Sequence, residues 1–357
     1  MKEHNTVYRQ NGRFAGWPAN HGGWNWGDEI LISFQDCEHD TRWEDRHSVV
    51  PDCVRYMIFA RSLDGGKTWR IERPEMKHLY DQSDNKIQSM DDVSDCPGGV
   101  DFSHPGFCAY FTLSGTSAEH PSWWGYSLDR GRHWSGPYNI PNMGFSGINA
   151  RTDYHIRSAD ELTVFLTATR SDNLNEGQVI CAKLSEGGAK WELTGVLGDR
   201  YPEEWEIMPA SARRENGDWV VLVRGERSRS HPNREWWYMS QYESYDDGKT
   251  WTDKGPILPI PYSSSSNPPA LVAMKNGAWC VAYGWRREPY GLRCMFSRDE
   301  GRTWGPEIVL RDDAAYWDLG YPRMVENASG QLVVAYYYNE TGAGERYIDA
   351  TVFDERA

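Results

Sequence analysis

A short segment near the N-terminus gathers side chains that can move protons. The stretch DCEHDTRWEDRHSVVPDC, residues 36–53, holds four aspartates and two histidines. Histidine changes its charge near neutral pH, and a positioned carboxyl group can act as a general acid. We therefore take His47 and Asp52 as candidate acid/base residues. The cysteines and histidines of this stretch fit no known zinc spacing, so we expect no metal and no cofactor.

The segments that must position these residues are indicated by a repeat. The pattern S-x-D-x-G-x-x-W occurs as SLDGGKTW (62–69), SLDRGRHW (127–134), SYDDGKTW (244–251) and SRDEGRTW (297–304), with an altered copy LSEGGAKW (184–191). Glycine allows a positive φ in a turn, the Ser and Asp side chains can bond to turn N–H groups, and the Trp can pack beneath. The spacing of about 55–60 residues is typical of one four-stranded propeller blade.

Between these boxes the chain alternates short apolar runs with turns. The runs are rich in Val, Ile, Phe, Tyr and Trp and are predicted to be strands at residues 28–34, 55–62, 107–115, 161–170, 218–225, 278–286 and 331–340. We predict an all-β fold, a six-bladed β-propeller of four-stranded antiparallel blades, with seven blades as the alternative. Residues 1–357 are expected to form a single domain.

Two local features of this architecture follow from the same pattern. The last blade lacks a box, and an N-terminal strand near His4–Arg9 is expected to complete it, which would hide an exposed sheet edge. The segment Tyr262–Pro269 contains SSSSNPP and is expected to be a loop inside a blade.

Composition narrows the classes of partner. The formal charge is −14, and no run of Lys and Arg forms a basic patch, so nucleic acid is not an expected partner. No stretch of 18 apolar residues predicts a membrane span. The seven Cys are an odd number without a disulfide framework, and the N-terminus lacks an apolar signal region, so we expect a cytoplasmic protein. A trimmed secreted or periplasmic chain is the alternative, and the oligomeric state is not predicted.

The boxes are identified as Asp-box (BNR) repeats, and the whole chain resembles the sialidase superfamily of six-bladed β-propellers. Asp boxes also occur in propellers without sialidase activity, so the resemblance implies a fold first and an activity second. Sialidases bind the substrate carboxylate with three arginines, and they use a Tyr nucleophile aided by a Glu together with an Asp acid/base.

The resemblance assigns the arginines one by one. The first arginine position of the family falls on Gly16 in FAGWPAN, so that arginine is missing. The second falls on Arg224 in EIMPASARRENGDWVVLVR, and the third on Arg286 or Arg287 in AYGWRREPYG. A bidentate Arg–carboxylate contact contributes about 1.5–3 kcal/mol, so the loss of one arginine opens the choice of sugar to a uronate or a neutral sugar.

The resemblance also implies the reacting groups. The family's tyrosine falls on Tyr321 in DLGYPRMV, with Arg323 two residues later. The family's glutamate falls on Met208, and Glu206 lies two residues earlier, so we assign Glu206 to activate Tyr321. The acid/base aspartate belongs to the segment before the first box, where Asp36, Asp40, Asp45 and Asp52 compete.

Tryptophans are abundant enough to suggest stacking against a sugar. The chain has 18 Trp, and the five boxes use five of them structurally. Among the others, Trp17 and Trp24 flank the first inner strand and are candidates to line the pocket. The remaining tryptophans are expected to rim the pocket or pack between blades.

We therefore expect a glycoside hydrolase of the sialidase superfamily that removes a terminal, acidic sugar from an oligosaccharide or polysaccharide. Tyr321 would attack with help from Glu206, Asp52 or His47 would protonate the leaving oxygen, and Arg224, Arg286 and Arg323 would hold anionic groups. The first alternative is a polysaccharide lyase that eliminates from a uronate, with His47 and Tyr321 moving protons. The second alternative is a non-catalytic carbohydrate-binding propeller.

Overall fold

The computed structural model describes residues 2–42, 47–51, 53–74, 76, 92–113, 115–116, 118–119, 121–170, 174–198, 204–227, 236–261, 266–342 and 344–355. These residues group into two compact units. Unit 1 is built from Met1–Arg73 and Ser263–Ala357, and unit 2 from Ser83–Tyr262. Each unit contains three antiparallel sheets. That residues 1–357 form a single domain stays a prediction.

Unit 1 holds the sheets that carry both chain ends. The first has the order β2-β4-β5-β6, with β3 paired to β4. The second has the order β19-β20-β21-β22, and the third β1-β25-β24-β23. Their bounds are β1 Glu3–Tyr8, β2 Arg13–Gly16, β3 Gly22–Trp26, β4 Glu29–Glu38, β5 Tyr56–Ser62, β6 Arg70–Glu72, β19 Ala270–Ala273, β20 Trp279–Trp285, β21 Tyr290–Ser297, β22 Ile308–Ala314, β23 Gly320–Glu326, β24 Leu332–Tyr338 and β25 Tyr347–Phe353. A 3₁₀ turn, η1, spans Pro18–Asn20.

Unit 2 holds the remaining sheets. Their orders are β7-β8-β9, then β10-β12-β13-β14 with β11 paired to β12, and β15-β16-β17-β18. Their bounds are β7 Cys108–Leu113, β8 Ser122–Ser127, β9 Ser135–Asn139, β10 Ile148–Asn149, β11 Tyr154–Ile156, β12 Leu162–Thr169, β13 Glu176–Ser185, β14 Lys190–Leu197, β15 Glu204–Arg213, β16 Trp219–Arg227, β17 Trp236–Ser244 and β18 Thr252–Pro261. A 3₁₀ turn, η3, spans Glu186–Gly188 within the altered box.

These sheets are the blades of a six-bladed β-propeller, so the predicted fold class is confirmed. Each of the seven predicted strand segments overlaps an observed strand. The segment Tyr262–Pro269 was predicted to lie inside a blade, and this is wrong. Its described residues 266–269 follow the sheet of β18 and precede β19, which belongs to another sheet. In the part of the chain that the structure describes, no helix is long and apolar enough to cross a membrane.

Each box joins the last two strands of its sheet through a network of side-chain hydrogen bonds. In the first box the Gly66 N–H donates to Ser62 Oγ at 2.9 Å, and the Thr68 N–H donates to Asp64 Oδ1 at 2.9 Å. The Trp69 Nε1–H donates to the Gly66 carbonyl at 3.1 Å. Slight burial would raise the pKa of Asp64, but the hydrogen bonds from Thr68 and Ser62 lower it to about 2. The box thus stabilises a turn and supplies no group for chemistry.

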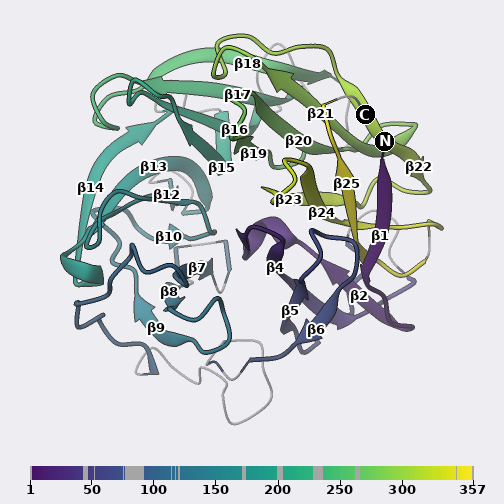
Figure 1. Ribbon diagram of the computed structural model, residues 1–357, viewed down its shortest axis with the longest axis horizontal. Helices are drawn as coiled ribbons and strands as arrows, with labels where there is room; N and C mark the ends of the chain where they lie inside the picture. The colour runs from purple at the N-terminus through teal and green to yellow at the C-terminus, as the bar shows by residue number, and fades with distance from the viewer. Residues whose placement is uncertain are drawn as a thin grey trace. The chain divides into compact units, whose positions relative to one another are not determined.

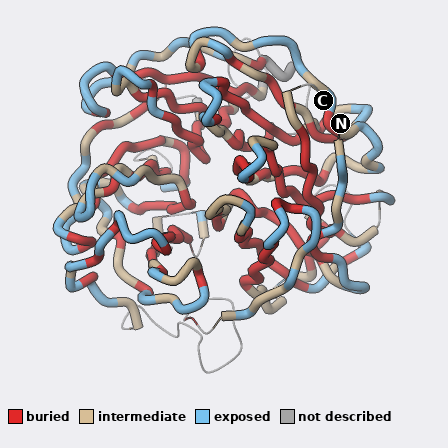
Figure 2. The backbone as a smooth tube through the Cα atoms, viewed as in Figure 1, coloured by how far each residue is buried: buried red, intermediate tan, exposed pale blue. Residues whose placement is uncertain are grey.

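The last sheet is completed by the first strand of the chain. β1 pairs with β25 in antiparallel register, with His4 opposite Thr351, as Figure 1 shows for the purple strand beside the yellow one. The predicted closure by an N-terminal strand is therefore confirmed. The strands are mostly buried and the hairpin turns mostly exposed (Figure 2).

A hydrophobic core joins the first and last sheets of unit 1. It contains Phe34 from β4, Tyr337 from β24 and Ile348 from β25, each with no exposed surface. Burial of side chains of this size contributes about 1.5–3 kcal/mol each, so the two sheets are held firmly against one another.

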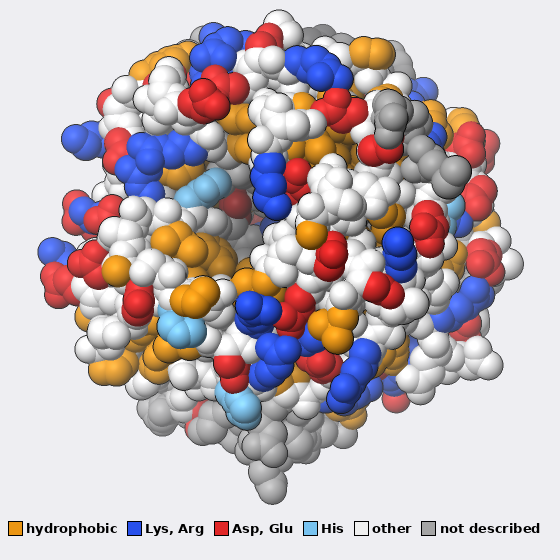
Figure 3. All heavy atoms as spheres, viewed as in Figure 1, with side chains coloured by type: hydrophobic (Ala, Val, Ile, Leu, Met, Phe, Trp, Pro, Cys, Tyr) orange, Lys and Arg blue, Asp and Glu red, His pale blue; other side chains and the backbone are white. Residues whose placement is uncertain are grey.

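On the face drawn in Figure 3, acidic and basic side chains intermingle.

A backbone feature recurs at three positions that precede proline. Trp17, Met208 and Tyr321 adopt φ angles of 58°, 56° and 49°, in the left-handed region. Each is followed by a proline. Trp17 follows β2 directly, whereas Met208 lies within β15 and Tyr321 within β23. Residues other than glycine avoid this region at a cost of about 1–2 kcal/mol, so three occurrences mark a conformation that the fold imposes.

Candidate active site

A buried carboxylate organises the polar centre of unit 1. Asp318 has no exposed surface, and its Oδ1 lies 2.7 Å from Nδ1 of His47. The Tyr337 hydroxyl donates to the same oxygen at 2.6 Å, and Arg346 Nε donates to Oδ2 at 3.3 Å. Burial would raise the pKa of Asp318, but His47 and then Arg346 and Arg286 hold it well below its usual range. Asp318 is therefore a carboxylate at neutral pH.

His47 is positioned by a short ladder that follows β4. His39 pairs with Val49, and the Asp40 N–H donates to the Ser48 carbonyl at 2.9 Å, next to His47. The imidazole lies edge-on to Trp17 at 5.1 Å and at 6.0 Å from Trp317. Its side chain is 37% exposed, so a ligand can reach it. With Nδ1 bound to Asp318, Nε2 is the nitrogen that can exchange a proton.

Tyr321 opens β23 in its left-handed conformation, where the strand pairing with β24 is irregular. Its N–H donates to Oδ1 of the buried Asn267 at 2.7 Å, which fixes the turn. Its ring lies 6.0 Å from Tyr337 and 5.4 Å from the guanidinium carbon of Arg286. Left-handed residues other than glycine concentrate at functional sites, and the role assigned to Tyr321 from the sequence stays a prediction.

The two arginines that were assigned to unit 1 contact protein acceptors. Arg286 is buried, and it donates to the Leu319 carbonyl at 3.0 and 3.1 Å and to the Tyr337 hydroxyl at 2.8 Å. Arg323 donates to the Ala19 carbonyl at 2.6 Å. Both side chains therefore hold the site together through backbone carbonyls.

The two tryptophans assigned to the pocket have different surroundings. Trp17 lies just before η1 and packs on Phe14, with the ring centroids 4.7 Å apart. Its ring also lies near Tyr337 and the guanidinium of Arg55, and its contact with His47 places it beside the acid/base candidate. Trp24 lies on β3 and is 7% exposed, so only a small part of its surface can meet a ligand.

Glu206 and Arg224 belong to unit 2. The hydroxyls of Tyr238 and Tyr242 donate to the two oxygens of Glu206 at 3.2 and 2.7 Å. Burial and Glu206 raise the pKa of Tyr242 far above its ordinary value. The carboxylate of Glu206 therefore has two tyrosine partners within its own sheet. Its pairing with Tyr321 would join the two units and stays a prediction.

Arg224 lies in a cage of large side chains on β15, β16 and β17. Its guanidinium carbon is 5.3 Å from the Trp205 ring and 5.5 Å from the Trp237 ring. Its Nη1 lies 3.8 Å from Sδ of Met208, the residue with the left-handed conformation in this sheet. Cation–π contacts of this kind contribute about 0.5–2 kcal/mol, so they hold the guanidinium in place.

The competing aspartates of the first blade separate by burial and partners. Asp36 is buried and bound by Arg13 at 2.8 Å, and Asp40 is buried and bound by Arg42 at 2.6 Å. Asp45 and Asp52 lie outside the described residues. Among the described residues, no group of three or more His, Cys, Asp or Glu side chains is arranged to hold a metal ion.

Sequence reasoning missed the residues that hold the reacting groups. Asp318 lies three positions before Tyr321 in DLGYPR, and its place next to the predicted tyrosine was the only available signal. Asn267 lies in the serine-rich segment that was taken for a loop inside a blade. Tyr337 and Arg346 carried no signal, because only the folded sheet brings β24 and the residue before β25 to Asp318.

Comparison with known proteins identifies the repeat and the fold. Residues 109–334 match the model of the BNR repeat-like domain. A comparison with curated proteins gives no match.

Solved structures share the fold over most of the chain. A Dyadobacter fermentans protein of unknown function superimposes with a TM-score of 0.71 at 18% identity, covering 99% of this chain and 98% of that one. A Hadza microbial sialidase gives 0.64 at 16% identity, covering 96% and 66%. The α-L-arabinofuranosidase of Fusarium graminearum, solved with arabinobiose, gives 0.60 at 17% identity, covering 97% and 94%. These TM-scores establish a shared fold, and this fold occurs in a sialidase and in an arabinofuranosidase.

Proposed function

Because the chain belongs to the BNR repeat-like domain family, we propose that it is a glycoside hydrolase that removes a terminal sugar from a glycan. The observation that carries the proposal is the buried Asp318 bound to Nδ1 of His47, in the same network as Tyr321. A carboxylate behind an imidazole fixes its tautomer and stabilises its charged form, which is what a proton donor to a leaving group needs. The sialidase and the arabinofuranosidase that share this fold are both glycosidases, which supports the reaction class.

In the proposed mechanism the Tyr321 oxygen attacks the anomeric carbon, and the bond to the leaving oxygen breaks. His47 gives its Nε2 proton to that oxygen and then takes a proton from the water that releases the sugar from Tyr321. Sialidases are the group of glycosidases in which a tyrosine is the nucleophile. Glu206 is proposed to receive the tyrosine proton, and Asp52 is the alternative proton donor.

The nature of the sugar is the finer part of the proposal. An acidic sugar was expected from the sequence, with arginines holding its carboxylate. However, Gly16 replaces one arginine of the sialidase pattern, and Arg286 and Arg323 donate to backbone carbonyls. These contacts favour a terminal neutral sugar over an acidic one, so both classes belong in the test.

The test is turnover of a panel of aryl glycosides that includes neutral pentosides and hexosides, uronides and sialosides. Tyr321→Phe and His47→Ala should each reduce kcat by about 10²–10⁴-fold on whichever substrate is hydrolysed. The matched control is Tyr245→Phe, since Tyr245 is an exposed tyrosine of the third complete box. Full activity of Tyr321→Phe would eliminate the tyrosine mechanism.

A polysaccharide lyase is the second candidate, and the His47–Tyr321 combination favours it. β-Elimination from a uronate needs a base for the C5 proton and an acid for the leaving oxygen, and a histidine and a tyrosine can supply both. The product carries a conjugated double bond, so ultraviolet absorbance grows as the polymer is cut. Absorbance growth on a polyuronate, without release of a saturated sugar, would decide for the lyase.

A further inference from the structure

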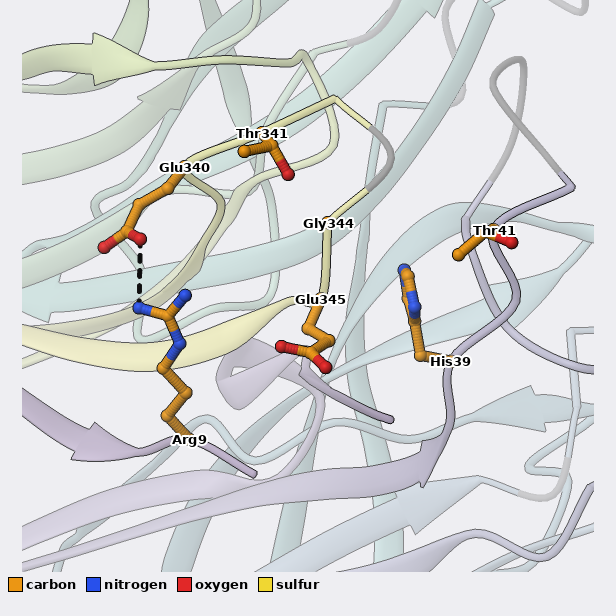
Figure 4. Close-up of a pocket in the computed structure, with 7 residues that line it drawn as sticks. All are labelled: Arg9, His39, Thr41, Glu340, Thr341, Gly344 and Glu345. Atoms are coloured by element: carbon orange, nitrogen blue, oxygen red, sulfur yellow. Dashed lines mark hydrogen bonds and ion pairs between the residues drawn. The ribbon is translucent and has the colours of Figure 1, made fainter. Parts of the chain in front are cut away.

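A cavity of about 190 Å³ lies in unit 1 between two loops. One loop follows β4 and contributes His39 and Thr41, and the other joins β24 to β25 and contributes Glu340, Thr341 and Glu345. Arg9 closes one side. Figure 4 shows Glu340 and Arg9 facing each other, with His39 and Thr41 on the opposite loop. The cavity is smaller than the ~300–1,000 Å³ of sites for drug-sized ligands, so it suits a single small ring.

The lining is rich in hydrogen-bond acceptors. Glu340 makes an exposed ion pair with Arg9 at 3.0 Å, and Glu345 accepts from the Gly12 N–H at 2.6 Å. A carboxylate has about four acceptor positions, so both retain capacity for further donors. Two carboxylates repel an anionic ligand, whereas the hydroxyl groups of an uncharged ligand can donate to them.

His39 adds a nitrogen that suits the same ligand. Its Nε2 is buried and has no hydrogen-bond partner of normal geometry among the residues that the structure describes, and the backbone of Gly344 lies close to the ring. Burial and the nearby Arg346 lower the pKa of His39, so its ring is neutral at neutral pH. A neutral imidazole can donate a hydrogen bond with one nitrogen and accept one with the other, and a sugar hydroxyl can also do both, so the two can pair.

Both walls of the cavity connect to the proposed reaction centre. The first wall is the ladder of His39 and Val49 that positions His47. The second wall is held by the buried Arg346, which donates to the carbonyls of Gly344 and Gly342 and to Asp318. The same Asp318 binds His47. The cavity and His47 are therefore attached to the same buried pair of Asp318 and Arg346.

We propose that this cavity is an accessory subsite for an uncharged, hydroxyl-rich sugar residue of the glycan whose terminal sugar reacts at Tyr321. The inference rests on the proposed function, and it adds a second sugar and its chemical class. It assigns Glu340, Glu345 and His39 to hydroxyl recognition.

The first experiment measures binding without catalysis. Tyr321→Phe protein is titrated in ligand-observed NMR with neutral disaccharides and trisaccharides of arabinose, galactose and glucose, and with digalacturonate and glucosamine. A neutral saccharide should bind best. Adding Glu340→Gln should weaken it about 10-fold, since a hydrogen bond to a charged acceptor corresponds to roughly 10- to 100-fold in affinity. Thr41→Trp, which fills the cavity from an exposed loop position, should abolish it.

The matched control is Glu300→Gln. Glu300 forms a 3.0 Å ion pair with Arg302 inside a box, so it repeats the Glu340–Arg9 geometry away from the cavity. This control should leave binding unchanged. Absence of binding by every neutral saccharide, equal binding by the Glu340→Gln protein, or a preference for digalacturonate would each overturn the subsite.

The second experiment separates this inference from the proposed function. On the active protein, Glu340→Gln should lower kcat/KM for a trisaccharide about 10-fold relative to kcat/KM for the aryl monosaccharide, because only the trisaccharide reaches the cavity. An unchanged ratio would overturn the subsite while leaving hydrolysis intact. If no glycoside is cleaved, the proposed function fails and the binding experiment alone decides the subsite.

Discussion

Replacement of Asp318 by asparagine should damage stability and chemistry together. Asp318 and Arg346 are both fully buried, and their contact is 3.3 Å. At an effective dielectric of about 20, Coulomb's law gives about 5 kcal/mol for two charges at that separation. Asparagine can still accept hydrogen bonds from Tyr337 or Arg346, so we expect a loss of about 3–4 kcal/mol in the free energy of unfolding, in line with broken buried ion pairs.

The chemical effect has a separate cause. Without the carboxylate, His47 loses the partner that fixes its tautomer and stabilises its charged form, so kcat should fall by about 10²–10⁴-fold. The assay is kcat on the best glycoside of the panel as a function of pH, with urea denaturation measured on the same samples. Circular dichroism at the assay temperature establishes that the variant is folded.

The matched control for this prediction is Asp313→Asn. Asp313 also binds an arginine, Arg311, at 2.9 Å, and it accepts from the Tyr338 hydroxyl, which asparagine can still do, but its side chain is 63% exposed. An exposed pair contributes about 0–1 kcal/mol, so this variant should unfold almost as the parent does and keep its activity. Wild-type activity of a folded Asp318→Asn protein would refute the role of His47. A stability loss as small as that of the control would refute the buried ion pair.

Three further predictions concern stability. Burial raises the pKa of Asp349 to about 6 despite Arg311, so between about pH 4 and pH 6 the folded state binds more protons than the unfolded state. The free energy of unfolding, measured in urea, should therefore fall with rising pH over this range by at most about 3 kcal/mol. Asp349→Asn should flatten that fall, and an equal slope in the variant would contradict it. Asp64→Ala should lower the free energy of unfolding by about 1–2 kcal/mol, because the hydrogen bonds of the box are lost. The control Lys67→Ala, at an exposed position, should cost under about 0.5 kcal/mol. Because the pKa of Asp64 is lowered to about 2, the stabilisation by its carboxylate should vanish as the pH falls through about 2. Because φ of Tyr321 is 49°, Tyr321→Gly should be about 1 kcal/mol more stable than Tyr321→Ala in thermal unfolding, which is the reverse of the usual order in a strand. A more stable alanine variant would argue against the left-handed conformation.

The fold could be predicted because its information is local and repeated. Each box carries its own turn, and the contacts of Ser62 and Asp64 lie within four residues of one another. The closing strand could be predicted too, because a sheet without a box needs another strand to cover its edge. The segment around Asn267 was misjudged because a run of serines looks alike within a blade and between blades. The segment lies between two blades because β18 and β19 belong to different sheets.

The candidate site could be predicted only in part, since its support is assembled from distant segments. His47 and Tyr321 were proposed from residue type and family spacing, and their roles stay predictions. Asp318, which binds His47 and the Tyr337 hydroxyl, was missed because a single aspartate in a strand-poor segment has many possible roles. Its meaning appears when His47, 271 positions away, arrives at its Oδ1. The surroundings of Arg286 were equally hidden, because its acceptors are a backbone carbonyl and Tyr337 on another strand.

The left-handed residues before proline have a consequence for how such proteins diversify. Tryptophan, methionine and tyrosine occupy the same backbone conformation at positions 17, 208 and 321. The conformational cost is set mainly by the main chain, is lower for asparagine and aspartate, and is higher for β-branched side chains. A library that randomises these positions should therefore contain many folded members. Each of these three blades offers a position where the side chain can be exchanged without redesign of the scaffold, and new specificities can arise there by single substitutions.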